Sequence, residues 1–306
     1  MTRKSKARYG MNRTYKLNAG VKALRAALLI SLATVAIVPS AQAACTFVGN
    51  TITCSGAFGA TLNFGPGDVA LPFDPTVITL ENTTVINVLN GDGVDAFSLM
   101  DLTLTNDGSI TVYGNAYAID LAGIYAVSQY GDTSVINNGA IDVRNRYGDA
   151  YGIISASAYG DASATNTGNI VSASLYYDAH GMLVVAQYGD TSAINSGDIL
   201  AYSRYGTATG VAAVAPFGDV TISNEQYGTV LAQSVLGDAV GISAQSFTGD
   251  VSVDNEGAIT ALANYDATGI AASSIYGAVD VTNSGYVIAE SAYGTAIGIS
   301  AASVYS

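Results

Sequence analysis

A glycine followed by an aliphatic residue recurs along this chain with a period close to 29 residues. The steps between successive glycines are 29, 29, 29, 31, 28 and 29 residues. The seven dipeptides are Gly123-Ile124, Gly152-Ile153, Gly181-Met182, Gly210-Val211, Gly241-Ile242, Gly269-Ile270 and Gly298-Ile299. An asparagine column keeps the same period, at Asn137, Asn166, Asn195, Asn224, Asn255 and Asn283. Two columns with one period indicate a stacked structural unit, so most of the chain is predicted to be a solenoid.

Each repeat contains three short segments in which apolar and polar residues alternate with a period of two. In one repeat these segments include residues 124–128, residues 133–137 and the stretch that begins near Ile141. Such alternation, with β-branched residues and glycine-rich turns, predicts strands rather than helices. We therefore predict an all-β fold in which residues 91–306 form a parallel β-helix, with about 29 residues in each three-strand coil. The crossover rule for parallel strands predicts that the β-helix is right-handed.

Stacking of the coils turns each column into a ladder of like side chains. The inward asparagines are expected to pass hydrogen bonds from coil to coil and, with a nearby glycine, to supply left-handed backbone in the turns. Each coil has tyrosines at two turns, for example Tyr130 at one and Tyr147 at the other. Each is expected to stack on the tyrosine at the same turn of the neighbouring coil. An exposed aspartate column is expected to cost about 1 kcal/mol per neighbouring pair through carboxylate repulsion. Its members are Asp132, Asp161, Asp190, Asp219 and Asp250.

The first 43 residues have the pattern of a secretory signal peptide. Eight of the eleven basic residues precede residue 26, and the apolar run 26–38 follows them. The small-x-small site Ala41-Gln42-Ala43 comes next and predicts cleavage between Ala43 and Ala44, after export through the Sec translocon. The mature chain then keeps three arginines and 24 acidic residues, a charge of 3 − 24 = −21. Such a charge argues against nucleic acid as a partner.

Two cysteines follow the cleavage site. A lipoprotein would need an aliphatic residue shortly before Cys45, but residues 42–44 are Gln-Ala-Ala. The residues between Cys45 and Cys54 resemble two short strands around a Gly-Asn turn, and an exported protein matures in an oxidising compartment. We therefore predict a Cys45–Cys54 disulfide within an N-terminal cap and irregular coils over residues 44–90. At the other end Ser306 falls within a coil, so the β-helix is expected to be incomplete there.

Three motifs extend this interpretation. Residues 11–16 read Met-Asn-Arg-Thr-Tyr-Lys, residues 44–56 contain Ala-Cys…Cys-Ser-Gly, and residues 137–141 show the N-x-G-x-I form of the repeat. Together they resemble the passenger region of a Gram-negative autotransporter (type V secretion), with an extended signal peptide and Met11 as an alternative start. The resemblance implies a passenger at the cell surface, on the outer membrane or released from it, often acting as an adhesin. It also implies an outer-membrane β-barrel after Ser306, so the chain is expected to be truncated before that barrel, and periplasmic without it.

Enzyme chemistry is the weaker interpretation of these residues. Polysaccharide lyases with a β-helix resemble one another in using a Lys or Arg base, but Arg144, Arg146 and Arg204 are predicted to be solvated strand residues. His180, the only histidine, is predicted to lie in a turn, which argues against a Ser-His-Asp triad. The aspartate column offers almost any separation that a glycosidase pair needs, and therefore discriminates little. Calcium binding by that column stays an alternative.

We therefore predict a non-enzymatic interaction or adhesion scaffold that has neither catalytic residues nor a cofactor. Its expected partners are glycans or proteins on a host or neighbouring cell, which exposed tyrosine and serine columns would contact. A carbohydrate-active β-helix enzyme, lyase or hydrolase, is one alternative interpretation. A non-functional truncated remnant is another.

Overall fold

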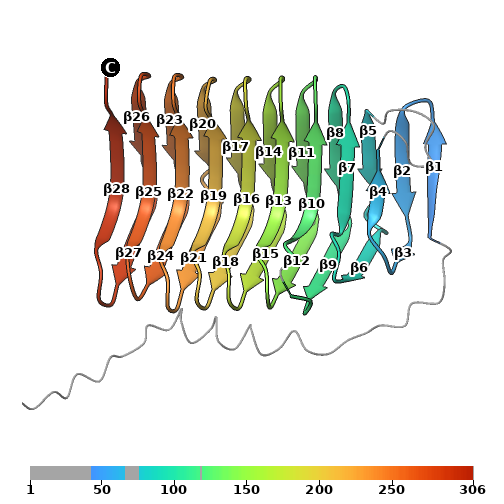
Figure 1. Cartoon of the computed structure of the whole chain (residues 1–306), viewed down its shortest axis with the longest axis horizontal. Helices are drawn as coiled ribbons and strands as arrows, with labels where there is room; N and C mark the ends of the chain where they lie inside the picture. The colour runs from blue at the N-terminus through green and yellow to red at the C-terminus, as the bar shows by residue number, and fades with distance from the viewer. Residues whose placement is uncertain (1–42, 66–75, 118, 306) are drawn as a thin grey trace, which may run out of the picture. The chain divides into compact units, whose positions relative to one another are not determined.

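The computed structural model describes residues 43–65, 76–117 and 119–305, and every regular element among them is a β-strand. These strands stack in three sheets that together wind as a β-solenoid (Figure 1). The predicted signal peptide, residues 1–43, lies outside the described residues except for Ala43. Residues 66–75 of the predicted cap region, and Ser306, also lie outside them.

The first sheet has ten strands and carries the asparagine column. In spatial order they are β1 (Ala44–Val48), β2 (Thr51–Ser55), β5 (Val77–Leu80), β8 (Leu102–Asn106), β11 (Thr133–Asn137), β14 (Ala162–Asn166), β17 (Thr191–Asn195), β20 (Val220–Asn224), β23 (Val251–Asn255) and β26 (Val279–Asn283). Only β1 and β2 pair antiparallel in this sheet. The first sheet therefore begins with a hairpin and continues as a parallel stack.

The second sheet has nine parallel strands and carries the aliphatic column that contains Ile141. Its strands are β3 (Ala57–Phe58), β6 (Val85–Leu89), β9 (Ser109–Gly114), β12 (Ala140–Asn145), β15 (Asn169–Ser174), β18 (Asp198–Ser203), β21 (Thr229–Ser234), β24 (Ala258–Ala263) and β27 (Tyr286–Ser291). The third sheet also has nine strands and carries the Gly-aliphatic column. Its strands are β4 (Leu62–Phe64), β7 (Val94–Ser98), β10 (Leu121–Ser128), β13 (Ala150–Ser157), β16 (Ala179–Ala186), β19 (Ala208–Ala215), β22 (Ala239–Ser246), β25 (Ala267–Ser274) and β28 (Ala296–Ser303).

Register between coils follows the sequence period. Asn166 pairs with Asn195 in the first sheet, and Ile141 pairs with Ile170 in the second. The 31-residue step keeps this register, because the two extra residues are absorbed in a turn where the N–H of Gly228 donates to the carbonyl of Glu225 at 2.7 Å. The predicted parallel β-helix is therefore confirmed, and its handedness stays a prediction. The stacked strands begin at β2, which is upstream of residue 91.

The core is a set of continuous apolar columns on the inward faces of the strands. In the second sheet the column residues from β9 to β24 are each at most 1 % exposed: Ile110, Ile141, Ile170, Ile199, Val230 and Ile259. Complete burial of such a side chain stabilises the fold by about 1.5–3 kcal/mol. Because the columns run from coil to coil, each coil covers the apolar face of the one before it.

The turn glycines serve a different purpose from the one predicted. Among the described residues only Asn90, Gly49 and Gly56 have a positive φ, so neither the column asparagines nor their glycines use left-handed backbone. A Cβ on Gly168 would instead overlap the carbonyl oxygen of Gly139 in the preceding coil. These turns therefore need glycine because successive coils approach closely there.

The predicted disulfide is present in the N-terminal hairpin. Cys45 of β1 and Cys54 of β2 face each other in the antiparallel pair and are bonded, with their Cα atoms 4.0 Å apart. Cys54 is completely buried, whereas Cys45 is partly exposed. The bond therefore fixes β1 against the first parallel strand of the solenoid.

Candidate functional site

The asparagine column forms a buried hydrogen-bonded ladder. In each step the side-chain N–H of one asparagine donates to the side-chain oxygen of the next, over 2.6 to 2.9 Å. The members are Asn106, Asn137, Asn166, Asn195, Asn224, Asn255 and Asn283. Asn106, which the sequence analysis did not include, begins this series. All members except Asn283 are at most 1 % exposed, so the ladder holds the coils together and does not face a ligand.

The exposed aspartate column is stabilised by backbone hydrogen bonds, which the sequence analysis did not foresee. Oδ1 of Asp132 accepts the backbone N–H of Asp161 at 2.8 Å, and Oδ1 of Asp161 accepts that of Asp190 at 2.8 Å. The same bond recurs from Asp101 to the end of the column, over 2.7 to 3.0 Å. Hydrogen bonds to a carboxylate are stronger than neutral ones and offset the repulsion between neighbours. The column is therefore a structural element and not only a cost.

A second aspartate column lies at the other turn that carries tyrosines. Oδ1 of Asp120 accepts the N–H of Asp149 at 2.8 Å, and Oδ1 of Asp149 accepts that of Asp178 at 2.9 Å. Thr207 takes the next place, where its N–H donates to Asp178 at 2.7 Å. The 29-residue spacing of these three aspartates was visible in the sequence and would have predicted the column.

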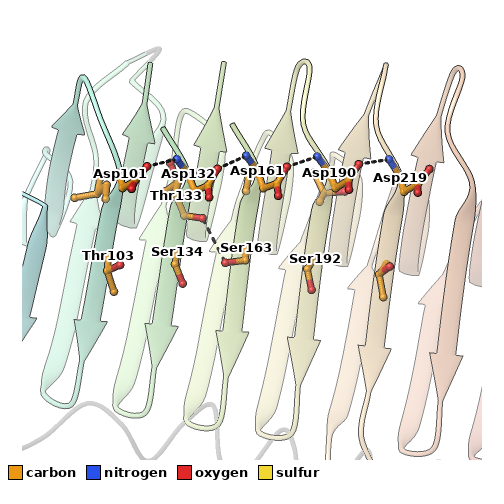
Figure 2. A pocket seen from close by; sticks show the side chains of 14 residues that line it. Asp101, Thr103, Asp132, Thr133, Ser134, Asp161, Ser163, Asp190, Ser192 and Asp219 are labelled. Carbon is orange, nitrogen blue, oxygen red and sulfur yellow. Dashed lines mark hydrogen bonds between the residues drawn. The ribbon is translucent and has the colours of Figure 1, made fainter. Parts of the chain in front are cut away.

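A groove of about 670 Å³ follows the first aspartate column from Asp101 to Asp219. Figure 2 shows the carboxylates in one row and the outward hydroxyls of the first sheet in a second row. The hydroxyl row is Thr103, Ser134, Ser163, Ser192 and Thr221. Among the described residues, Oδ2 of Asp132, Asp161 and Asp190 has no hydrogen-bond partner. The groove therefore offers regularly spaced acceptors and donors to a ligand lying along the solenoid.

Two exposed aromatic stacks also run from coil to coil. Tyr130, Tyr159, Tyr188 and Phe217 form the first stack, in which ring centroids are 5.3 to 5.6 Å apart. Each of these rings is separated from a groove aspartate by one glycine in the sequence. The second stack is Tyr117, Tyr147, Tyr176 and Tyr205, with centroids 4.2 to 5.5 Å apart. It ends at Tyr205 because the next coil has Leu236 there. Tyr293, which the sequence period also predicts for this column, lies three coils beyond Tyr205 and is not part of the stack.

Arg144 lies in β12 on the outer face of the second sheet, whereas Arg146 and Arg204 lie in the turns that follow β12 and β18, so the prediction of strand residues was wrong for these two. We call these three residues the arginine face. Arg144 forms an ion pair with Asp142, with 2.9 Å between Nε and Oδ1, and this hydrogen bond raises the pKa of Arg144. Arg146 lies over the ring of Tyr147 at 5.0 Å, and Arg204 lies over that of Tyr205 at 5.5 Å. Attraction between a cation and a ring face holds these two side chains at the second stack.

His180 lies in strand β16 and not in a turn, so that prediction was wrong. The third-sheet strands β10 to β28 begin two residues before the column glycine, and His180 therefore pairs with Tyr151 of β13. The two rings stack with centroids 4.9 Å apart. Nδ1 of His180 is buried without a hydrogen-bond partner among the described residues. Burial lowers the pKa of His180, although Asp178 and Asp149 oppose the shift.

No family model, curated protein or solved structure matches this chain. Within residues 43–65, 76–117 and 119–305, no three His, Cys, Asp or Glu side chains lie close enough to share a metal ion. The same part of the chain has no helix that is long and apolar enough to cross a membrane. The groove, the aromatic stacks and the arginine face are among the surface features of the described residues that are open to a ligand.

Proposed function

We propose that this chain is an exported passenger of the autotransporter kind and acts as a non-enzymatic adhesion scaffold for extended glycans. The observation that carries the proposal is the groove along the first aspartate column, with its adjacent aromatic stack. Both features repeat at the coil spacing of about 4.8 Å. A polymer that lies along the solenoid can therefore make the same contact in several coils, and such multivalency raises its avidity.

The side chains of the groove and of the first aromatic stack are suited to binding sugars. Aromatic faces pack against the apolar face of a sugar ring, and the ring of Tyr159 is 58 % exposed. Carboxylate oxygens and serine hydroxyls exchange hydrogen bonds with sugar hydroxyls. The hydroxyl row lies on strands, and the aspartates lie in turns that are hydrogen-bonded from coil to coil. Little flexibility is therefore lost when a ligand binds.

A display experiment tests the binding proposal. The chain is fused to the β-barrel of an unrelated autotransporter, and cells that display it are tested on surfaces coated with polysaccharides or proteins. Replacing Tyr159 and Tyr188 together by alanine should abolish adhesion to the polysaccharide, because it removes the centre of the first stack. Tyr293→Ala is the matched control, since this exposed tyrosine belongs to neither stack. Adhesion that survives the double change, or that needs only a protein surface, would refute the proposal.

The secretion proposal is tested separately. The sequence pattern of residues 1–43 and the Cys45–Cys54 disulfide support export to an oxidising compartment. Expression of the unfused chain should give a periplasmic protein whose first residue is Ala44, as N-terminal sequencing would show. An uncleaved cytoplasmic product would contradict this. Release of reducing or unsaturated ends from mixed polysaccharides would instead establish the enzyme alternative.

A further inference from the structure

The arginine face contains a pocket of about 280 Å³ that the groove does not include. Its lining contains Arg144, Arg146, Ala173, Leu175 and Tyr202. Arg144 belongs to β12, Ala173 to β15 and Tyr202 to β18, so the pocket spans three successive coils of the second sheet. These are the coils that hold all the arginines of the described chain.

The pocket exists because one outward column changes abruptly in side-chain size. Register places Arg144, Ala173 and Tyr202 in a single column. Ala173 contributes only a methyl group between two long side chains. Arg144 and Tyr202 are two strand spacings apart, or roughly 10 Å, which leaves room for a six-membered ring above Ala173.

The guanidinium groups beside the pocket differ in their partners. Arg144 is bonded to both carboxylate oxygens of Asp142. Arg146 and Arg204 contact the faces of tyrosine rings, and neither forms an ion pair within residues 43–65, 76–117 and 119–305. The coil of Arg204 also has Thr207 where the second aspartate column would place a carboxylate. Two positive charges therefore stay available on an otherwise acidic protein.

We propose that this Arg–Tyr pocket binds a sugar residue that carries a carboxylate, with the carboxylate on Arg146 and the ring against Tyr202 above Ala173. Guanidinium groups bind carboxylates through charge-assisted hydrogen bonds in a planar fork. The tyrosine ring supplies a flat apolar wall for the sugar. The inference rests on the proposed glycan-binding function and adds a chemical class to it, namely acidic sugars. A sulfated sugar presents a similar anion, and the experiment below separates the two.

Titration calorimetry of the whole chain with oligogalacturonate tests the proposal. The oligosaccharide should bind at low salt, and the same oligosaccharide with methyl-esterified carboxylates should bind at least about tenfold more weakly. The change Arg146→Gln should weaken binding of the acid by a similar factor. Ala173→Leu should do the same by filling the pocket. Gln233→Leu is the matched control, because Gln233 pairs with Tyr202 one coil further along the same column.

Three outcomes would overturn the proposal. These are equal binding of acid and ester, tighter binding of a sulfated oligosaccharide than of the carboxylated one, and variants that bind as the unchanged chain does. Circular dichroism of each variant separates loss of binding from loss of fold. A refuted pocket leaves the scaffold proposal intact, since the latter depends on Tyr159 and Tyr188, which lie outside this pocket.

Discussion

Replacing Asn195 by alanine should destabilise the solenoid far more than the same change at Asn283. Asn195 is 1 % exposed, accepts a hydrogen bond from Asn166 at 2.9 Å and donates one to Asn224 at 2.9 Å. Alanine would leave one N–H of Asn166 and one oxygen of Asn224 without these partners inside the core. Each buried group that loses its partner costs about 1–3 kcal/mol, so the free energy of unfolding should fall by about 2–6 kcal/mol.

Asn283 provides the matched control, because it ends the ladder in an exposed position. Water can replace its bond to Asn255, so Asn283→Ala should cost about 1 kcal/mol or less. Repeat proteins often unfold in several steps, and amide exchange in β17 is therefore a sharper assay than a single denaturation midpoint. A loss of 2–6 kcal/mol corresponds to roughly 30-fold or faster exchange there. Equal effects at the two sites would show that the ladder does not hold the coils together.

Three other predictions concern particular side chains. Gly168→Ala should disrupt the stacking of neighbouring coils, because the added Cβ would overlap the backbone of the preceding coil. Loss of the strand signal in circular dichroism would show this. Gly298→Ala is the control and should be tolerated, since its Cβ would meet nothing within 4 Å. Burial lowers the pKa of His180 below its unfolded value of 6.5, so the unfolded state binds the proton more readily. Stability should therefore decrease as the pH falls below about 6.5, and His180→Phe should lose part of that decrease in thermal unfolding at several pH values. Replacing Cys45 and Cys54 by serine should cost about 2–3 kcal/mol, because it opens a short loop, and amide exchange should increase mainly in β1 and β2. An unchanged exchange rate in that hairpin would contradict the last expectation.

The sequence predicts this fold well because residues one period apart become neighbours. The 29-residue step between Asn166 and Asn195 is also their pairing register, and alternation within residues 133–137 gives the inward face directly. The interruption near Asn224 was visible as a 31-residue step, and a turn absorbs it. In a globular fold such pairings would join segments with no common pattern.

The site was less predictable because it depends on backbone direction and on gaps between side chains. Asp132 was read as a repelling charge, since a sequence does not show that a backbone N–H of the next coil points at its carboxylate. The sequence predicts a turn at His180 because the glycine that follows it looks like the start of a strand, whereas β16 begins before that glycine and pairs with β13 on both sides of it. The pocket above Ala173 depends on the side chains that three successive coils place at the same outward position, and no sequence motif indicates that arrangement.

Each hydrogen bond of the first aspartate column requires only a main-chain N–H on the following coil. Ala278 meets that requirement as well as an aspartate does, and Thr207 and Thr295 do so at the second column. Gain or loss of one complete coil by gene duplication or deletion would thus keep this hydrogen bond wherever the coil before the new junction carries an aspartate. A chain built in this way can change its length in whole-coil increments without needing a new kind of contact between coils.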